Sequence, residues 1–439
     1  MRRPTMILLL VILVLAGSAC SAQVTSSRPR ATSPAVSGAS TAPTAVPSPV
    51  PSQRDGGHTA VPAPPTGQPS SAATSAPSPS VPTAAPQIDG AQATLARMSQ
   101  EQRVGQLFMV GTPASQGSLQ TLQQISRYHL GAVILTGRSH DGSSGTARVV
   151  AAMQARTGSA TAGARLLVAT DQEGGAVQVL QGPGLTSMPS ALEQGSWSPR
   201  QLRKAAGRWA RQLRRAGVNM NLAPVLDTVP SPGAASGNAP IGAYGREYGF
   251  TPGTVARHGL AFARGMADHG VAPTVKHFPG LGRVHGNTDY SSGVVDSTTR
   301  RDDPYLAPFR RAIRAGVPFV MMSTASYSHL DPAIPAAFSR FVIENMLRGD
   351  LGFRGVVVSD DLANAQQVAR WSYGQRAVKF IAAGGDLVLA VDPAALPAMY
   401  HAVLHRARHD RGFRAKVRAA ALRVLRAKRS LDLLRQPRS

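Results

Sequence analysis

The stretch GVVVSDD, residues 355–361, passes from an unbroken apolar run into a serine and two aspartates. Unbroken apolarity, as opposed to alternation with polar residues, is typical of a strand that is buried on both faces of a parallel sheet. The stretch therefore predicts a buried strand whose carboxyl end carries polar side chains.

Segments of the same kind recur along the chain, and each is followed by a turn and a helical pattern. The other seven are GQLFMVG (105–111), GAVILTG (131–137), RLLVATD (165–171), VNMNLAP (218–224), VAPTVKH (271–277), PFVMMST (318–324) and DLVLAVD (386–392). Eight buried strands that alternate with helices predict an α/β fold, a (β/α)8 barrel of the TIM type. A doubly wound sheet stays possible, because a number of strands does not prove that a barrel closes.

The helical patterns have identifiable starts and faces. Ser99 and Gln102 have the spacing of a capping box, in which each side chain accepts a hydrogen bond from the backbone N–H of the other residue. In the range 413–431 the apolar residues fall on one helical face and arginines on the other. Both features predict helices that pack one face against a core.

Residues 1–20, MRRPTMILLLVILVLAGSAC, contain two arginines, an apolar run and a small-residue segment that ends at Cys20. This is the plan of a secretory signal peptide, and the apolar run is too short for a comfortable membrane span. Cys20 is the only cysteine of the chain, and the ending Gly-Ser-Ala-Cys resembles a bacterial lipobox, although Gly17 replaces the usual Leu, Val or Ile. We expect Cys20 to be lipidated, with ordinary secretion as the alternative.

Residues 21–88 consist almost entirely of Ser, Thr, Pro, Ala, Gly and Val, with few charges. This composition cannot bury enough apolar surface to offset the loss of chain entropy, so a disordered tether is expected. The remaining range, 89–439, suits one large α/β domain. The prediction is a barrel domain outside the cytoplasm, held to the cell membrane by an N-terminal lipid or secreted.

The charge of the chain is strongly positive, with 47 Lys and Arg against 23 Asp and Glu and a formal net charge of +24. The arginines are scattered over helix faces such as 200–215, without a nucleic-acid-binding motif of interleaved aromatic residues. We therefore expect no nucleic-acid partner. We also expect the protein to be a monomer. The positive charge would favour polyanionic wall polymers or anionic lipid head groups nearby.

Polar residues gather at the carboxyl ends of the predicted strands, namely Asp171, Lys276, His277, Ser323, Asp360, Asp361 and Asp392. In a (β/α)8 barrel these ends form the active face, whereas the opposite face contributes mainly stability. Asp361 is interpreted as a cap of the following helix, because adjacent residues at a strand end point in different directions. The grouping as a whole predicts a functional site.

Three segments are specific enough for comparison with known families: LLVATDQEGGAVQVL (166–180), KHFPGLG (276–282) and LRGDLGFRGVVVSDDL (347–362). Together they resemble glycoside hydrolase family 3, and within it the single-domain β-N-acetylglucosaminidases (β-hexosaminidases) of the actinobacterial lipoprotein type. The family motifs are DQEGG, KHFPGHG and the segment that presents the nucleophile. Weaker matches are NLAPVLD (221–227), the Arg246-Glu-Tyr element and the closing helix RVLRAKRSL (423–431). The resemblance spans 95–431.

The resemblance implies that Asp360 is the nucleophile, which forms a covalent glycosyl-enzyme and gives net retention. Glycosidic cleavage passes through an oxocarbenium-like transition state, which needs a carboxylate near the anomeric carbon. The resemblance also implies that Asp171, Arg246, Lys276 and His277 bind sugar hydroxyls, and an ion pair between Asp171 and Lys276 is compatible with that role. No His-Glu-x-x-His or comparable cluster occurs, so we expect neither a metal nor a cofactor.

The loop after KHFPGLG departs from the family. The glucosaminidases place their acid/base there as Asp-Ser-His, with the Asp orienting the His. Here residues 283–291 read RVHGNTDYS, the loop is longer, and Ser291 stands in place of that His. Either His285 reaches the site with Asp289 orienting it, or Asp289 is the acid, with a pKa raised by desolvation. His285 could also be an ordinary exposed loop residue.

Further departures affect specificity. Leu281 replaces the second His of KHFPGHG, and Ala176 and Val179 replace two arginines that usually follow DQEGG. We expect a retaining exo-β-N-acetylglucosaminidase that acts on a carbohydrate substrate, N-acetylglucosamine-bearing fragments of peptidoglycan. The alternatives are a β-N-acetylglucosaminide phosphorylase, with Arg283 helping to hold phosphate, and a non-catalytic wall-sugar-binding lipoprotein.

Overall fold

The computed structural model describes residues 89–434. The predicted signal peptide, the lipidation site at Cys20 and the predicted tether lie outside these residues, so they stay predictions. Within residues 89–434, no helix combines the length and the apolar character that a membrane span requires.

Eight parallel strands close into a barrel, which confirms the predicted (β/α)8 fold and excludes a doubly wound sheet. The order around the barrel is β1-β12-β11-β9-β7-β6-β3-β2. These strands are β1 (Phe108–Pro113), β2 (Ala132–Thr136), β3 (Leu167–Thr170), β6 (Met220–Asn221), β7 (Ala272–Phe278), β9 (Phe319–Met322), β11 (Val356–Asp361) and β12 (Leu387–Ala390). Each predicted segment overlaps one of them.

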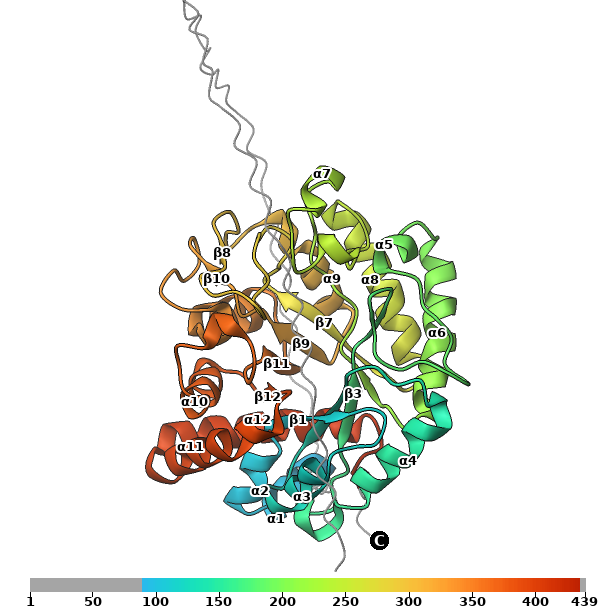
Figure 1. Cartoon of the computed structure of the whole chain (residues 1–439). Coiled ribbons are helices and arrows are strands. Elements are labelled where there is room, and N and C mark those ends of the chain that lie inside the picture. Colours follow the sequence, from blue (N-terminus) through green and yellow to red (C-terminus); the bar gives the residue numbers. More distant parts are fainter. Residues whose placement is uncertain (1–88, 435–439) are drawn as a thin grey trace, which may run out of the picture. The chain divides into compact units, whose positions relative to one another are not determined.

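Helices surround the strands (Figure 1). They are α1 (Gly90–Arg97), α2 (Gln100–Gly105), α3 (Leu119–Arg127), α4 (Gly142–Gln154), α5 (Ala191–Gln194), α6 (Pro199–Arg215), α7 (Pro232–Ala235), α8 (Pro252–Ala267), α9 (Ala307–Arg314), α10 (Tyr373–Ala383), α11 (Leu396–His409) and α12 (Arg411–Arg429). A π-helix, η5 (Phe341–Asp350), connects β9 to β11. The 3-10 turns are η1 (Gly158–Thr161), η2 (Gly242–Tyr244), η3 (Pro304–Leu306), η4 (Ala336–Phe338), η6 (Gln366–Val368) and η7 (Pro393–Ala395).

Two small sheets stand outside the barrel. β4 (Gln172–Gly174) pairs with β5 (Val177–Gln178), and β8 (Val295–Asp296) pairs with β10 (Ser326–Tyr327). Both lie in connections that leave the carboxyl ends of barrel strands, β4 and β5 after β3, and β8 after β7. They therefore shape the face of the barrel on which a site was predicted.

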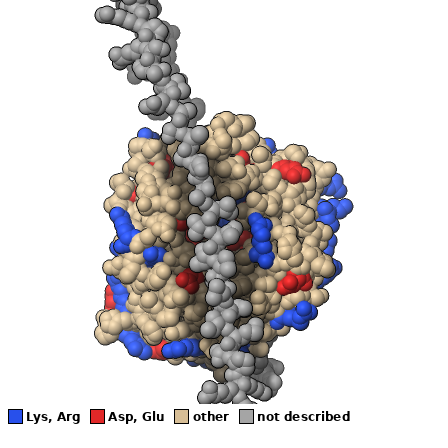
Figure 2. Space-filling model, viewed as in Figure 1, with Lys and Arg blue, Asp and Glu red and all other residues tan. Residues whose placement is uncertain are grey.

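The helix starts follow the predicted capping chemistry. Ser99 and Gln102 form the expected capping box at the start of α2. Ser198 and Gln201 form another at the start of α6, whose apolar face is buried while its arginines lie outside. Figure 2 shows Lys and Arg side chains along the edge of the unit on which α6 lies in Figure 1.

Apolar side chains fill two layers, one inside the barrel and one between the strands and the helices. The inner layer includes Met109, Ile134, Leu167, Met220, Phe319, Val358 and Leu389. The outer layer includes Val110, Val133, Val168, Val275, Val357 and Val388. Because successive residues of a strand point to opposite faces, both layers need apolar residues. Two-sided burial is the reason that the strand segments are unbroken apolar runs.

One of the fully buried ionisable residues is a lysine. Lys428, on α12, is fully buried, and its Nζ donates a hydrogen bond to Gln106 Oε1 at 2.6 Å. No ion pair joins it to a carboxylate among residues 89–434. Burial disfavours the charged ammonium and lowers the pKa of Lys428 to about 7.

Replacement of Lys428 by Met should flatten the pH dependence of stability. Between about pH 7 and pH 10 the unfolded chain keeps a proton on this lysine that the folded chain has lost, so the free energy of unfolding rises with pH. The contribution is about 2 kcal/mol between pH 7 and pH 9. Urea denaturation at both pH values measures it, with the exposed Lys204→Met as the control. An equal pH dependence in wild type and Lys428→Met would contradict the assignment.

Candidate active site

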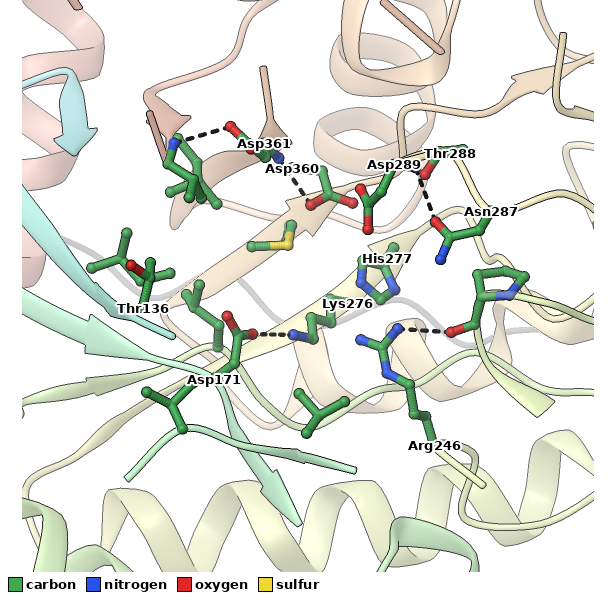
Figure 3. Close-up of a pocket in the computed structure, with 18 of the residues that line it drawn as sticks. Thr136, Asp171, Arg246, Lys276, His277, Asn287, Thr288, Asp289, Asp360 and Asp361 are labelled. Atoms are coloured by element: carbon green, nitrogen blue, oxygen red, sulfur yellow. Dashed lines mark hydrogen bonds and ion pairs between the residues drawn. The ribbon is translucent and has the colours of Figure 1, made fainter. Parts of the chain in front are cut away.

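A pocket of about 400 Å³ lies at the carboxyl ends of the barrel strands. Six residues predicted from the sequence line it together, namely Asp171, Arg246, Lys276, His277, Asp289 and Asp360 (Figure 3). They come from the ends of β3, β7 and β11 and from the loops that follow η2 and β7. The structure thus brings together side chains that are up to 189 positions apart in the sequence (171 to 360).

A buried ion network forms one wall of the pocket. The Glu173 carboxylate accepts hydrogen bonds from Arg246 Nε at 2.9 Å and Arg246 Nη2 at 2.7 Å. Lys276 Nζ lies 2.7 Å from Glu173 Oε1 and 2.6 Å from Asp171 Oδ1. The ion pair between Asp171 and Lys276 that the sequence left open is therefore present. The Glu173 and Lys276 side chains are each only 3% exposed.

The charges of this wall set the ionisation of Glu173. Burial alone would raise its pKa, but the neighbouring Arg246 and Lys276 cations outweigh burial and lower the pKa to about 2. Burial would likewise lower the pKa of Lys276, yet the carboxylates of Asp171 and Glu173 raise it. Glu173, Lys276 and Arg246, whose pKa is also raised by Glu173, are therefore charged at neutral pH, and the wall offers fixed cations and carboxylate oxygens to a ligand.

His277 is fixed by Asp227, which is completely buried. Asp227 Oδ2 accepts a hydrogen bond from His277 Nδ1 at 2.7 Å, and Asp227 Oδ1 accepts from the backbone N–H of His277 at 3.1 Å and of Leu281 at 2.8 Å. A carboxylate can only accept, so Nδ1 carries the hydrogen. The peptide bond between Lys276 and His277 is cis, and both residues line the pocket.

The two aspartates at the end of β11 have different surroundings. Asp361 accepts hydrogen bonds from the backbone N–H groups of Ala363 at 2.9 Å and Val391 at 3.0 Å and from the Asn364 side chain at 2.8 Å. It therefore holds the turn after β11, where the sequence had suggested a helix cap. Asp360 Oδ1 accepts a single hydrogen bond, from the backbone N–H of Asp361 at 2.9 Å, among residues 89–434.

Asp289 faces Asp360 from the loop after β7, and Figure 3 shows the two carboxyl groups pointing toward one another. Asp289 is itself an exposed residue, but its carboxyl group is turned into the pocket. Removal of that group from water raises the pKa of Asp289 to about 6, and the negative charge of Asp360 adds to the effect. Near neutral pH, Asp289 is therefore present in both its protonated and its ionised form.

The backbone of this loop is held in place by one neighbouring segment, residues 366–367. The backbone N–H of Gln366 donates to Asp289 O at 3.2 Å, and that of Gln367 donates to Thr288 O at 3.1 Å. The Gln367 side chain also donates to Val294 O at 3.0 Å and accepts from Val294 N at 2.8 Å. The position of Asp289 thus depends on the connection between β11 and α10.

His285 does not line the pocket. It is exposed, and its Nδ1 lies 3.1 Å from the carbonyl oxygen of Gly237. Arg283 is also directed away, because its Nη2 donates to Asp303 Oδ2 and Thr299 Oγ1, each at 2.6 Å. The structure therefore does not place either residue where the sequence hypotheses would need it, and it leaves Asp289 as the loop residue that faces Asp360.

Glu173 and Asp227 are site residues that the sequence analysis did not single out. Both could have been identified from the sequence, since Glu173 belongs to the DQEGG motif and Asp227 ends the NLAPVLD segment. Ala176 and Val179 line the pocket at the two positions where the family has arginines. Arg138, from the end of β2, borders the same wall and donates from Nη2 to Ala176 O at 2.9 Å.

The arrangement suits proton transfer and attack by a carboxylate. A carboxyl group with a raised pKa, here Asp289, that faces a second carboxylate is typical of an acid and a nucleophile acting together. Among residues 89–434, no group of three or more His, Cys, Asp or Glu side chains is placed to hold a metal ion. The opposite wall, with Arg246, Lys276, His277 and Asp171, can bind a ligand that carries several hydroxyl groups.

Comparison with known proteins gives consistent matches. Residues 99–427 match the glycosyl hydrolase family 3 N-terminal domain. The chain is similar to a β-hexosaminidase of Stenotrophomonas maltophilia, with 36% identity over 251 residues, which is 55% of this chain and 71% of the relative. A β-hexosaminidase of Xanthomonas oryzae pv. oryzae is 31% identical over 310 residues, 68% of this chain and 88% of the relative. The chain is also similar to a β-N-acetylhexosaminidase from Beutenbergia cavernae whose crystal structure is known. The two sequences are 52% identical, the TM-score is 0.75, and the match covers 76% of this chain and 99% of the Beutenbergia chain.

Replacement of Arg246 by Ala should destabilise the protein by about 3 kcal/mol, because it removes one of the two cations that compensate the buried Glu173. Chemical denaturation measures the loss. Arg203→Ala is the matched control, since Arg203 makes a similar two-bond contact with Asp268 at the surface and should cost less than about 1 kcal/mol. Equal losses in the two variants would show that Glu173 does not depend on Arg246.

Proposed function

The chain belongs to glycosyl hydrolase family 3 and is a glycoside hydrolase, and we propose that it is an exo-acting β-N-acetylglucosaminidase that retains the anomeric configuration. The observation that carries the proposal is the pair of carboxyl groups that face one another in the pocket, Asp360 and Asp289. A retaining glycosidase needs one carboxylate as nucleophile and a second carboxyl group as acid and then base. The relatives named β-hexosaminidase support the sugar class.

In the first proposed step, Asp360 attacks the anomeric carbon while Asp289 gives its proton to the leaving-group oxygen. The glycosidic C–O bond breaks, a C–O bond to Asp360 forms, and the leaving group departs as an alcohol. A pKa of about 6 leaves a useful fraction of Asp289 protonated near neutrality. Asp289 is preferred to His285 as the proton carrier, because Asp289 lines the pocket and His285 does not.

In the second step, Asp289 acts as a base. It takes a proton from a water molecule, the resulting hydroxide equivalent attacks the anomeric carbon, and the bond to Asp360 breaks. Two inversions at one carbon give net retention. Asp289 regains its proton and Asp360 its negative charge, so the pair returns to its starting state.

The opposite wall of the pocket would hold the terminal sugar. Lys276, Arg246 and Asp171 present charged donors and acceptors, and charge-assisted hydrogen bonds to sugar hydroxyls are strong and directional. The contacts of Glu173 and Asp227 fix these groups before a ligand binds, which reduces the entropy lost on binding.

We further propose that the natural substrates are N-acetylglucosamine-bearing fragments of peptidoglycan. The support is the predicted export signal with its lipidation site at Cys20, which would place the enzyme at the outer side of the cell membrane. Phosphorolysis is the second enzymatic outcome to test. Phosphorolysis has little structural support, because Arg283, the residue suggested to hold phosphate, pairs with Asp303 and does not line the pocket.

Turnover of an aryl β-N-acetylglucosaminide by the full chain tests the proposal. Asp360→Asn should lower kcat by at least about 1000-fold, because it removes the nucleophile. Asp289→Ala should lower it by about 100-fold or more, whereas His285→Ala should stay within about twofold. Assays with and without inorganic phosphate distinguish hydrolysis from phosphorolysis. A fully active Asp360→Asn would refute the proposed nucleophile, and a larger loss in His285→Ala than in Asp289→Ala would reassign the proton carrier.

The pH dependence of kcat/KM gives a further test. The acid must be protonated in the free enzyme, so activity should be lost as the pH rises through about 6, by about tenfold per unit well above that value. Initial rates at low substrate concentration between pH 5 and pH 8 measure the profile. A profile that stays flat up to pH 8 would exclude Asp289 as the acid, because its group would then be deprotonated throughout the active range.

A further inference from the structure

A second concave region lies beside the catalytic pocket. We define this outer groove, of about 510 Å³, by Ser292, Val295, Ser326, Gln366, Arg370 and Trp371, which are among the residues that line it. None of these residues lines the catalytic pocket. The outer groove is therefore separate from the site described above.

The outer groove is continuous with the loop that carries Asp289. Ser292 follows Asp289 by three positions in the sequence. Gln366 lines the outer groove, and its backbone N–H donates to the carbonyl oxygen of Asp289 at 3.2 Å. The same short segment therefore borders the catalytic pocket on one side and the outer groove on the other.

An exposed aromatic residue lies at this border. Tyr290 is 79% exposed, the most exposed of the large hydrophobic side chains among residues 89–434. It follows Asp289 directly, and its backbone N–H donates to Asn287 O at 3.2 Å, which fixes the turn. A tyrosine ring left in water has no role in the core, but it can stack on the apolar face of a sugar.

The direction in which a leaving group extends follows from the proposed chemistry. The acid must contact the glycosidic oxygen, so the first unit of the leaving group lies against Asp289. Tyr290 is the next residue, and the outer groove begins two positions later, at Ser292. A leaving group longer than one sugar would therefore pass Tyr290 and reach the outer groove.

We propose that the outer groove and Tyr290 bind the leaving group of the substrate, and that this leaving group is a glycan of two or more sugars. The proposal rests on the proposed function, because it takes Asp289 as the acid. It adds a second binding region to the enzyme, one that would set which N-acetylglucosaminides are cleaved fast.

The chemistry of the outer groove fits a sugar chain. The Trp371 ring is perpendicular to the Phe338 ring, with ring centroids 5.1 Å apart and planes at 89°, and the Arg370 guanidinium lies over one face of the indole, 3.9 Å from its ring centroid. A fixed indole bordered by hydroxyl and amide groups, here those of Ser292, Ser326 and Gln366, combines stacking with hydrogen bonding. Mixed surfaces of this kind match a ligand that has both apolar ring faces and hydroxyl edges.

The test compares a long and a short leaving group. Chitotetraose and an aryl β-N-acetylglucosaminide serve as substrates of the full chain, because Trp371 lines the outer groove and not the catalytic pocket, and only chitotetraose has a leaving group of several sugars. For Trp371→Ala, the ratio of kcat/KM for chitotetraose to that for the aryl substrate should fall about tenfold. Trp371→Phe, which keeps a ring, should restore most of the ratio, and Tyr290→Ala should lower it.

The matched control is Tyr244→Ala, which removes a tyrosine that is 53% exposed and borders neither the catalytic pocket nor the outer groove. Its ratio should equal that of the wild type. An unchanged ratio in Trp371→Ala, or an equal loss on both substrates, would overturn the proposal. Failure of the wild type to cleave the aryl substrate would instead refute the proposed function.

A binding measurement separates recognition from catalysis. In the Asp360→Asn background, titration with chitotetraose should show about tenfold weaker binding when Trp371 is replaced by Ala, and no change when Tyr244 is replaced. N-acetylglucosamine alone should bind equally to all these variants, because it does not extend beyond the catalytic pocket. Equal affinity for chitotetraose with and without Trp371 would also overturn the proposal.

Discussion

The buried carboxylate of Glu173 is the constraint on which the site depends. A carboxylate this far from water is tolerated only because Arg246 and Lys276 both pair with it, and the cost of removing three charged groups from water is recovered only when the geometry is good. The three groups come from β4, from the segment after η2 and from β7. Their pairing therefore requires that the barrel has closed and that its loops are in place, so it couples the fold directly to the wall that is proposed to bind the sugar.

The carboxyl groups of the site differ because their neighbours differ. Glu173 is held ionised by cations, with a pKa of about 2, and acts as a fixed support. Asp361 is tied to backbone N–H groups and holds a turn. Asp289 has its pKa raised to about 6 by burial and by the charge of Asp360. Residues of one chemical type thus take up separate roles through local burial and charge alone.

The barrel could be predicted from the sequence because two-sided burial leaves a direct pattern, the unbroken apolar run. All eight runs overlap strands, and the residues Asp171, Lys276, His277 and Asp360 that end such runs do meet in one pocket. The eight runs predicted a closed barrel but could not prove closure over a doubly wound sheet, since no local pattern encodes which strand pairs with which. The same limit explains why the role of Glu173 was missed, because its partners come from other connections.

For the loop at 283–291, the sequence could not predict which residue carries the proton. Its composition offered two proton carriers, and only the path of the loop, set by hydrogen bonds to Gln366 and Gln367, brings Asp289 into the pocket and leaves His285 outside. Spacing within the loop could not decide this, since the residues that hold it lie more than 70 positions further along the chain (289 to 366). Lys428 shows the same limit in the core, because the helical pattern gave no sign that its amine lies among apolar residues.

In the proposed mechanism, the facing carboxyl groups would let one residue, Asp289, serve as acid and then as base. In the free enzyme, the charge of Asp360 helps to raise the pKa of Asp289, which favours the protonated form that the first step needs. In the proposed glycosyl-enzyme, Asp360 is an uncharged ester, so this contribution is lost and the pKa of Asp289 falls. The lower pKa favours the carboxylate form that the second step needs. In this proposal, hydrolysis then restores the charge of Asp360 and its contribution to the raised pKa of Asp289, which adds to the larger effect of desolvation.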